Sequence, residues 1–338
     1  MRFNEFKAIN PNKVLLEYDP NVSDDQLKDL IVKRLQTEED RDMLDKIYQA
    51  LEKSTLDERI AGALEKDEDA KSKLKVFAGL VMNTEGTFAD KQAFVQNYPN
   101  GYIDVEKLKT PNQVHGFSEW LMGDEFVKRV FDNLYTYAPQ GIGPGEYALA
   151  VLSPEIKASG RSADSAGDLV ILGEMCEVKA KQSSGGRFVD VRKAKMNQRA
   201  IEAAFKNLGI DPGRAVSAKK WTDSVRSEAQ QADTAGFKDL VTTILEGAFA
   251  FLDKNQTQKL RAAIETGENN QIKHEWGLAS FQNYKTMSKF ETMLLLDGPK
   301  RHSLYFTDAE AVSGVLKAQQ PLLYGPDQEV HPQMEFRI

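Results

Sequence analysis

Two short β-type runs separated by a glycine turn constrain the fold of this chain more than any other feature. Leu169-Val-Ile-Leu172 and the run around Glu177-Val178-Lys179 lie on either side of Gly173-Glu174. This spacing predicts an antiparallel hairpin. Side chains alternate faces along a strand, so Glu177 and Lys179 point the same way and Val178 points into a core. The pairing brings Asp168, at the start of the first run, close to the Glu177–Lys179 end of the second.

A fourth charged residue precedes the hairpin. Glu146 begins an apolar helical run that continues to Leu152, and a helix packed nearby would bring its carboxylate to the same edge of the sheet. Clustered carboxylate oxygens suit a hard divalent cation such as Mg²⁺ or Mn²⁺. A neighbouring ammonium stabilises charge that develops on a phosphate, or helps to activate water. The sequence therefore predicts a metal site at which Glu146, Asp168, Glu177 and Lys179 converge.

At these residues the chain resembles the PD-(D/E)XK nuclease superfamily. The family pattern is a helix glutamate, an aspartate at the start of one strand and E-x-K on the next, matched here by Glu146, Asp168, Glu177 and Lys179. The ordered set GPGE, GD, EVK and GGR looks most like the phage-encoded type, and the resemblance covers roughly 115–205 and about 275 to the C-terminus. It implies that Asp168 and Glu177 ligate the metal, that Lys179 assists water attack and that Glu146 completes the site as a third metal ligand. Glycine, where the pattern has proline, precedes Asp168.

Each of these residues also has a plain structural interpretation. Lys179, taken by itself, is explained as a solvent-exposed lysine on a strand. Glu146 follows Pro144-Gly145 and is also explained as an acid favoured by the helix dipole. Asp168 follows a glycine and is also explained as a turn residue. The ordered combination, rather than any single residue, favours the nuclease site.

Residues that would contact a nucleic acid follow the E-x-K strand. Residues 182–187 read QSSGGR, which is either a plain flexible loop or a loop whose backbone N–H groups and Arg187 approach a phosphate. The net charge of −7 is unusual for a DNA-binding protein, but residues 177–226 hold about twelve Lys and Arg against about five Asp and Glu. The alternative is an ordinary charged helix surface. The predicted DNA-contacting residues are Lys181, Ser183, Ser184, Arg187, Arg192 and Lys193.

The length of 338 residues favours two domains, or one elaborated domain. We predict an α+β protein in which a mixed central sheet is flanked by helices. The predicted division is a helical N-terminal module over 1–110 and a nuclease-like domain over 111–338, with a helical insertion at about 207–272. Toward the C-terminus the pattern predicts strands over 290–296 and 303–306 joined by an Asp297-Gly298 hairpin, a short helix from Thr307 through Leu316, and an edge strand over 334–338.

The remaining composition narrows the class of protein. The single cysteine, Cys176, cannot form an internal disulfide and is expected to be a small buried side chain. The sequence has neither a signal-peptide pattern nor an apolar run of membrane-spanning length. We therefore expect a soluble protein of the reducing host cytoplasm, or of a virion, that does not enter a membrane.

These features lead to two functional hypotheses. The first is a Mg²⁺- or Mn²⁺-dependent endonuclease acting on DNA, phage-encoded and associated with the virion or with DNA packaging. The alternative is a structural or assembly protein of a phage particle that uses a nuclease-like core for binding rather than turnover. The N-terminal helical module is a candidate docking element for phage structural proteins.

Overall fold

The computed structural model describes 77, 79–136, 145–159, 167–181, 186–187, 198–211, 223–249, 251–324 and 331–338. These residues form a mixed fold of helices and strands, as the sequence predicted. Six strands hydrogen-bond in the order β1-β7-β6-β4-β3-β2, and three others form a smaller sheet in the order β5-β9-β8. The chain divides into two compact units, which are described separately.

The first unit contains the described residues up to Thr110 together with His115–Gln182 and Lys300–Ser303. Its elements are α5 (Phe88–Asn97), the 3-10 helix η2 (Tyr98–Asn100), α6 (Val105–Leu108), α7 (Phe117–Trp120), α8 (Glu125–Thr136), α9 (Glu146–Leu152), β2 (Ile156–Ala158), β3 (Leu169–Ile171) and β4 (Glu174–Lys181). Most of the N-terminal module predicted over 1–110 lies outside the described residues, so the division at residue 110 stays a prediction.

The β3–β4 hairpin forms as predicted, with its turn one residue earlier. Leu169 pairs with Cys176 and Ile171 pairs with Glu174 in an antiparallel register. Leu172 and Gly173 occupy the turn with φ angles of 49° and 87°, which matches the two positive φ values of a type I′ hairpin turn. Glu174 is therefore the first residue of β4 and not part of the turn.

Strand β2 extends this hairpin on its outer side, a strand that the sequence pattern did not reveal. Ala158 pairs with Leu169 and Ile156 pairs with Ile171, again antiparallel. The three strands β2, β3 and β4 thus run as a continuous meander. Cys176 is fully buried and Val178 is 2% exposed, which confirms both as core side chains.

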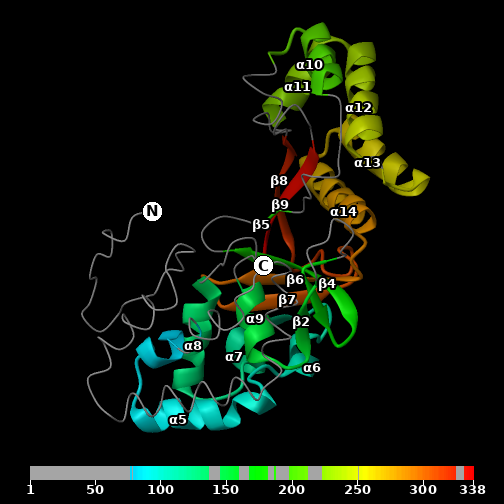
Figure 1. Cartoon of the computed structure of the whole chain (residues 1–338). Coiled ribbons are helices and arrows are strands. Elements are labelled where there is room, and N and C mark those ends of the chain that lie inside the picture. The colour runs from blue at the N-terminus through cyan, green and yellow to red at the C-terminus, as the bar shows by residue number, and fades with distance from the viewer. Residues whose placement is uncertain are drawn as a thin grey trace. The chain divides into compact units, whose positions relative to one another are not determined.

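Helix α9 is buried in the first unit and is hydrogen-bonded to it at its C-terminal end. All of its residues from Tyr147 to Leu152 are buried, and it contacts both α8 and β2 (Figure 1). The Tyr98 hydroxyl donates to the Val151 carbonyl oxygen at 2.7 Å. The Tyr102 backbone N–H donates to the Leu152 carbonyl oxygen, also at 2.7 Å. A buried helix anchored in this way holds the residue at its opposite end, Glu146, in a defined position.

The second unit contains Pro111–Val114, Ser183–Pro299 and Leu304–Ile338. Its elements are β5 (Gly186–Arg187), α10 (Gln198–Asn207), α11 (Asp223–Ala232), α12 (Thr234–Ala248), α13 (Lys254–Thr266), α14 (Asn269–Ser288), β6 (Thr292–Asp297), β8 (Lys317–Tyr324) and β9 (His331–Arg337). Strands β1 (Val114–Gly116) and β7 (His302–Phe306) have residues in both units. The stretch predicted as a helical insertion, 207–272, contains α11, α12 and α13 in its described part.

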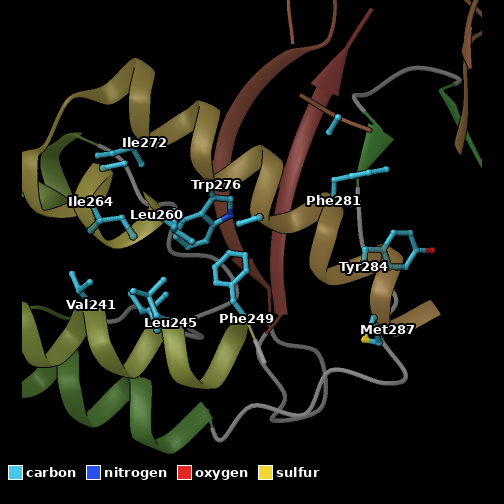
Figure 2. Packing of buried hydrophobic residues seen from close by; sticks show 14 of the residues in the cluster. Val241, Leu245, Phe249, Leu260, Ile264, Ile272, Trp276, Phe281, Tyr284 and Met287 are labelled. Atoms are coloured by element: carbon cyan, nitrogen blue, oxygen red, sulfur yellow. The ribbon is translucent and has the colours of Figure 1, made fainter. Parts of the chain in front are cut away.

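The core of the second unit lies where α12, α13 and α14 meet. Figure 2 shows Trp276 of α14 facing Phe249, with Leu260 close by. The Trp276 and Phe249 rings meet edge to face with their centroids 5.1 Å apart, a favoured aromatic geometry. Trp276 and Leu260 are fully buried. Helix α14 also packs against β8 and β9 (Figure 1), so one long helix serves both the helical core and the smaller sheet.

The C-terminal region follows the prediction in part. Strands β6 and β7 match the predicted hairpin. Strand β9 contains most of the strand predicted over 334–338, but it lies between β5 and β8 and is therefore not an edge strand. The predicted helix from Thr307 through Leu316 is wrong, because residues 309–315 form turns. The Asp308 carboxylate accepts from the Glu310 N–H at 3.0 Å, two residues on, which closes a local turn instead of capping a helix. Strand β8, whose Pro321 weakens a strand pattern, was not predicted.

Candidate metal and nucleic-acid site

Glu146, Asp168, Glu177 and Lys179, here called the carboxylate–lysine cluster, all belong to the first unit. Glu146 is the first residue of α9, behind Gly145 with a φ of 81°. Asp168 directly precedes β3, and Glu177 and Lys179 lie on β4. Strand β3 pairs with β4 as far as Leu169 opposite Cys176, so Asp168 and Glu177 both adjoin the end of this ladder.

The Asp168 carboxyl is held by the strand beside it. Its own N–H donates to the Cys176 carbonyl oxygen at 2.9 Å. The Val178 N–H donates to Asp168 Oδ2, also at 2.9 Å. Two bonds to the same strand, one from the backbone and one to the side chain, fix both the position and the direction of the carboxyl.

The pKa of Asp168 depends on the other three members of the cluster. Burial first, and then the negative charges of Glu177 and Glu146, together raise the pKa of Asp168 to about 8. The Lys179 ammonium and the bond from Val178 act in the opposite direction. Each of the other three members therefore lies close enough to Asp168 to perturb its ionisation. A carboxyl strained by two like charges is typical of functional sites.

Lys179 and Glu177 form an ion pair on β4. Lys179 Nζ contacts Glu177 Oε1, with the Glu177 side chain 6% exposed and that of Lys179 22% exposed. The contact confirms that these two residues point the same way. The Lys179 ammonium therefore contacts the carboxylate of Glu177, one of the predicted metal ligands, and places a positive charge within the cluster.

The chemistry of these donors fits a divalent cation bound through two protein ligands. Mg²⁺ is commonly held by one or two carboxylates, with water and substrate phosphate completing its shell, and Asp168 and Glu177 provide such a pair. Within the described ranges, no group of three or more His, Cys, Asp or Glu side chains is arranged to hold a metal ion. A role for Glu146 as a third ligand therefore stays a prediction.

The predicted DNA-contacting residues are placed only in part. Lys181 ends β4, and its carbonyl oxygen accepts from the Tyr135 hydroxyl at 3.2 Å. Arg187 lies in β5, where it pairs with Glu335 of β9, so Gly186-Arg187 is a short strand and not loop. The other predicted contacts lie outside the described residues: Ser183, Ser184, Arg192 and Lys193.

Sequence reasoning missed the residues that hold the cluster in place. Ser159 donates from its N–H to the Asp168 carbonyl oxygen at 3.0 Å and from its hydroxyl to the Gly167 carbonyl oxygen. Tyr135 secures the end of β4. Nothing in the serine- and glycine-rich sequence around Ser159 distinguishes it from its neighbours. The pairing of β2 with β3 gives it its role.

Comparisons with protein-family models, with curated proteins and with solved structures find no match for this chain. In the part of the chain that the structure describes, no helix is both long and apolar enough to span a bilayer.

Proposed function

We propose that this protein is a divalent-metal-dependent phosphodiester hydrolase that acts on DNA as an endonuclease, at the carboxylate–lysine cluster. The observation that carries the proposal is the contact between Lys179 Nζ and Glu177 Oε1 on β4, together with the bond from the Val178 N–H, between these two residues, to the Asp168 carboxyl. Three carboxylates and one ammonium leave two negative charges in excess when all are ionised. A divalent cation neutralises that excess and relieves the repulsion that Asp168 experiences.

Each residue then has a distinct task. Asp168 and Glu177 would hold the cation, and the Val178 N–H keeps the Asp168 carboxylate directed at it. A bound Mg²⁺ or Mn²⁺ supplies a Lewis acid that lowers the pKa of water and offsets charge on the phosphate. Lys179 places an ammonium beside Glu177, where it stabilises negative charge on the phosphate oxygens. Glu146, at the start of a buried helix, orients a water molecule near the same point.

The direct test is cleavage of supercoiled plasmid with Mg²⁺ or Mn²⁺, and of RNA of the same length in parallel. Asp168→Ala and Lys179→Ala are each expected to reduce DNA cleavage by at least about a hundredfold, as removal of a principal charge-stabilising group does in other enzymes. Glu177→Gln is expected to act like them. Glu174→Gln is the matched control, because Glu174 lies three residues earlier on the same strand and pairs with Lys109 at 3.1 Å instead.

Three results would contradict the proposal. One is cleavage that persists in both Asp168→Ala and Lys179→Ala. Another is an equal loss of DNA cleavage in Glu174→Gln and Glu177→Gln. That result would indicate that both changes disturb strand β4 and that Glu177 has no chemical role. The third is tight DNA binding without hydrolysis under any metal, which would favour the alternative of an assembly protein that keeps the core for binding alone.

A further inference from the structure

The peptide that joins Gly167 to Asp168 is held from the side of β2 by Ser159. Ser159 donates twice to this peptide segment: its N–H bonds to the Asp168 carbonyl oxygen at 3.0 Å, and its hydroxyl bonds to the Gly167 carbonyl oxygen. The β2–β3 register, continued by one residue, places Ser159 opposite Asp168. Ser159 and Asp168 therefore lie side by side, Ser159 just after β2 and Asp168 just before β3.

Gly167 leaves little freedom on the other side of this peptide. Its φ is +70°, and an added Cβ would lie 2.8 Å from the Cys176 carbonyl oxygen and 3.0 Å from the carbonyl carbon. The backbone therefore passes directly against β4 just before Asp168. Because Gly167 has no side chain to pack, the orientation of this segment depends on its hydrogen bonds.

Two bonds hold Asp168, which directly precedes β3. The Val178 N–H holds its side chain. The Ser159 hydroxyl holds the peptide bond before it, because it restricts rotation of the Gly167 carbonyl.

We propose that Ser159 is a positioning residue that aligns the Asp168 carboxylate for metal binding, an inference that rests on the function proposed above. Its hydroxyl does not touch the metal or the substrate; it acts through the Gly167–Asp168 peptide. Loss of a partner that orients a metal ligand lowers metal affinity by about 10- to 100-fold in other proteins. The same range applies here, because the ligand stays in place but loses one restraint.

The experiment compares Mn²⁺ binding and Mn²⁺-dependent cleavage in the full chain. Ser159→Ala removes the hydroxyl and keeps the N–H, and Ser159→Thr restores the hydroxyl. Ser153→Ala is the matched control: Ser153 is a buried serine of the same unit, and its hydroxyl accepts locally from the Glu155 N–H at 3.2 Å. Free Mn²⁺ measured by electron paramagnetic resonance gives the dissociation constant, and urea midpoints show that each variant is folded.

In Ser159→Ala we expect the Mn²⁺ dissociation constant to rise about tenfold or more. Cleavage should recover toward the wild-type rate as Mn²⁺ is raised, because the ligand itself is still present. Ser159→Thr should bind Mn²⁺ as the wild type does, and Ser153→Ala should leave the dissociation constant unchanged. If the role of Ser159 were purely structural, added Mn²⁺ would not restore cleavage in Ser159→Ala, and Ser159→Thr would not keep the wild-type affinity for Mn²⁺.

The results that overturn this inference differ from those that overturn the proposed function. If the wild type binds Mn²⁺ and cleaves DNA while Ser159→Ala does both equally well, only the positioning role is wrong. An equal loss of affinity in Ser159→Ala and Ser153→Ala would also refute it. If Asp168→Asn binds Mn²⁺ as the wild type does, and the wild type cleaves no DNA, the proposed function fails and the positioning role fails with it.

Discussion

The raised pKa of Asp168 predicts that the cluster destabilises the metal-free protein. The ordinary pKa of the carboxyl is 3.8, and burial together with two neighbouring carboxylates raises it to about 8 in the folded chain. The folded state then holds its proton more tightly than the unfolded state does. The stabilising effect of that proton is complete below about pH 4 and is lost as the pH rises to about 8.

The magnitude follows from the size of the difference in pKa. A rise from 3.8 to about 8 corresponds to about 6 kcal/mol above pH 8, at ~1.4 kcal/mol per pKa unit. Asp168 is intermediate between buried and exposed, so relaxation and solvent screening reduce this value, and roughly half, on the order of 3 kcal/mol, is expected. Asp168→Asn removes the ionisation and keeps an oxygen that can accept from the Val178 N–H.

The assay is urea unfolding in the presence of a chelator, for the wild type and Asp168→Asn, at about pH 4 and about pH 9. We expect nearly equal stabilities at the lower pH and a more stable variant at the higher pH. Glu174→Gln, which removes a carboxylate from the other end of β4, controls for a general effect of charge. A variant that is equally or less stable than the wild type at the higher pH would refute the electrostatic account of the cluster.

Three further changes test how the two units are built. Gly167→Ala should destabilise the protein by about 2 kcal/mol or more, because the φ of +70° and the Cys176 backbone leave no room for a Cβ; a urea midpoint close to the wild type would contradict this. Tyr135→Phe removes a hydrogen bond to Lys181 and should cost about 1 kcal/mol, with amide exchange faster at the end of β4 than elsewhere; unchanged exchange there would count against it. Trp276→Ala leaves a cavity at a fully buried position and should lower the free energy of unfolding by about 3–5 kcal/mol, measured by thermal or urea unfolding. A decrease below about 1 kcal/mol would contradict the packing described for the helical core of the second unit.

The sequence predicted the hairpin of the cluster because its signals are local. Val178 and Glu177 alternate as a strand requires, and a glycine marks the turn. The turn itself was placed one residue late because Leu172 has a positive φ, which is rare for a bulky residue and is imposed by the I′ geometry. The charge pattern also predicted that Glu146 and Lys179 would approach Asp168.

Other features depend on contacts that are distant in sequence. Strands β1 and β2 have three residues each, which is too short for an alternation of apolar and polar residues to show in the sequence. They are recognised as strands only by their pairing with neighbouring strands. The capping-box pattern from Thr307 to Glu310 predicted a helix, but Asp308 forms a local turn there instead. The positioning role of Ser159 follows from its place opposite Asp168, which no local pattern encodes.

The central claim is tested most directly by anomalous diffraction from crystals of this protein soaked in Mn²⁺. We predict one strong peak between Asp168 and Glu177, with a carboxylate oxygen of each at about 2 Å from the ion, and no such peak in Asp168→Asn. Mn²⁺ bound only elsewhere on the chain, or a peak that is unchanged in Asp168→Asn, would contradict the account.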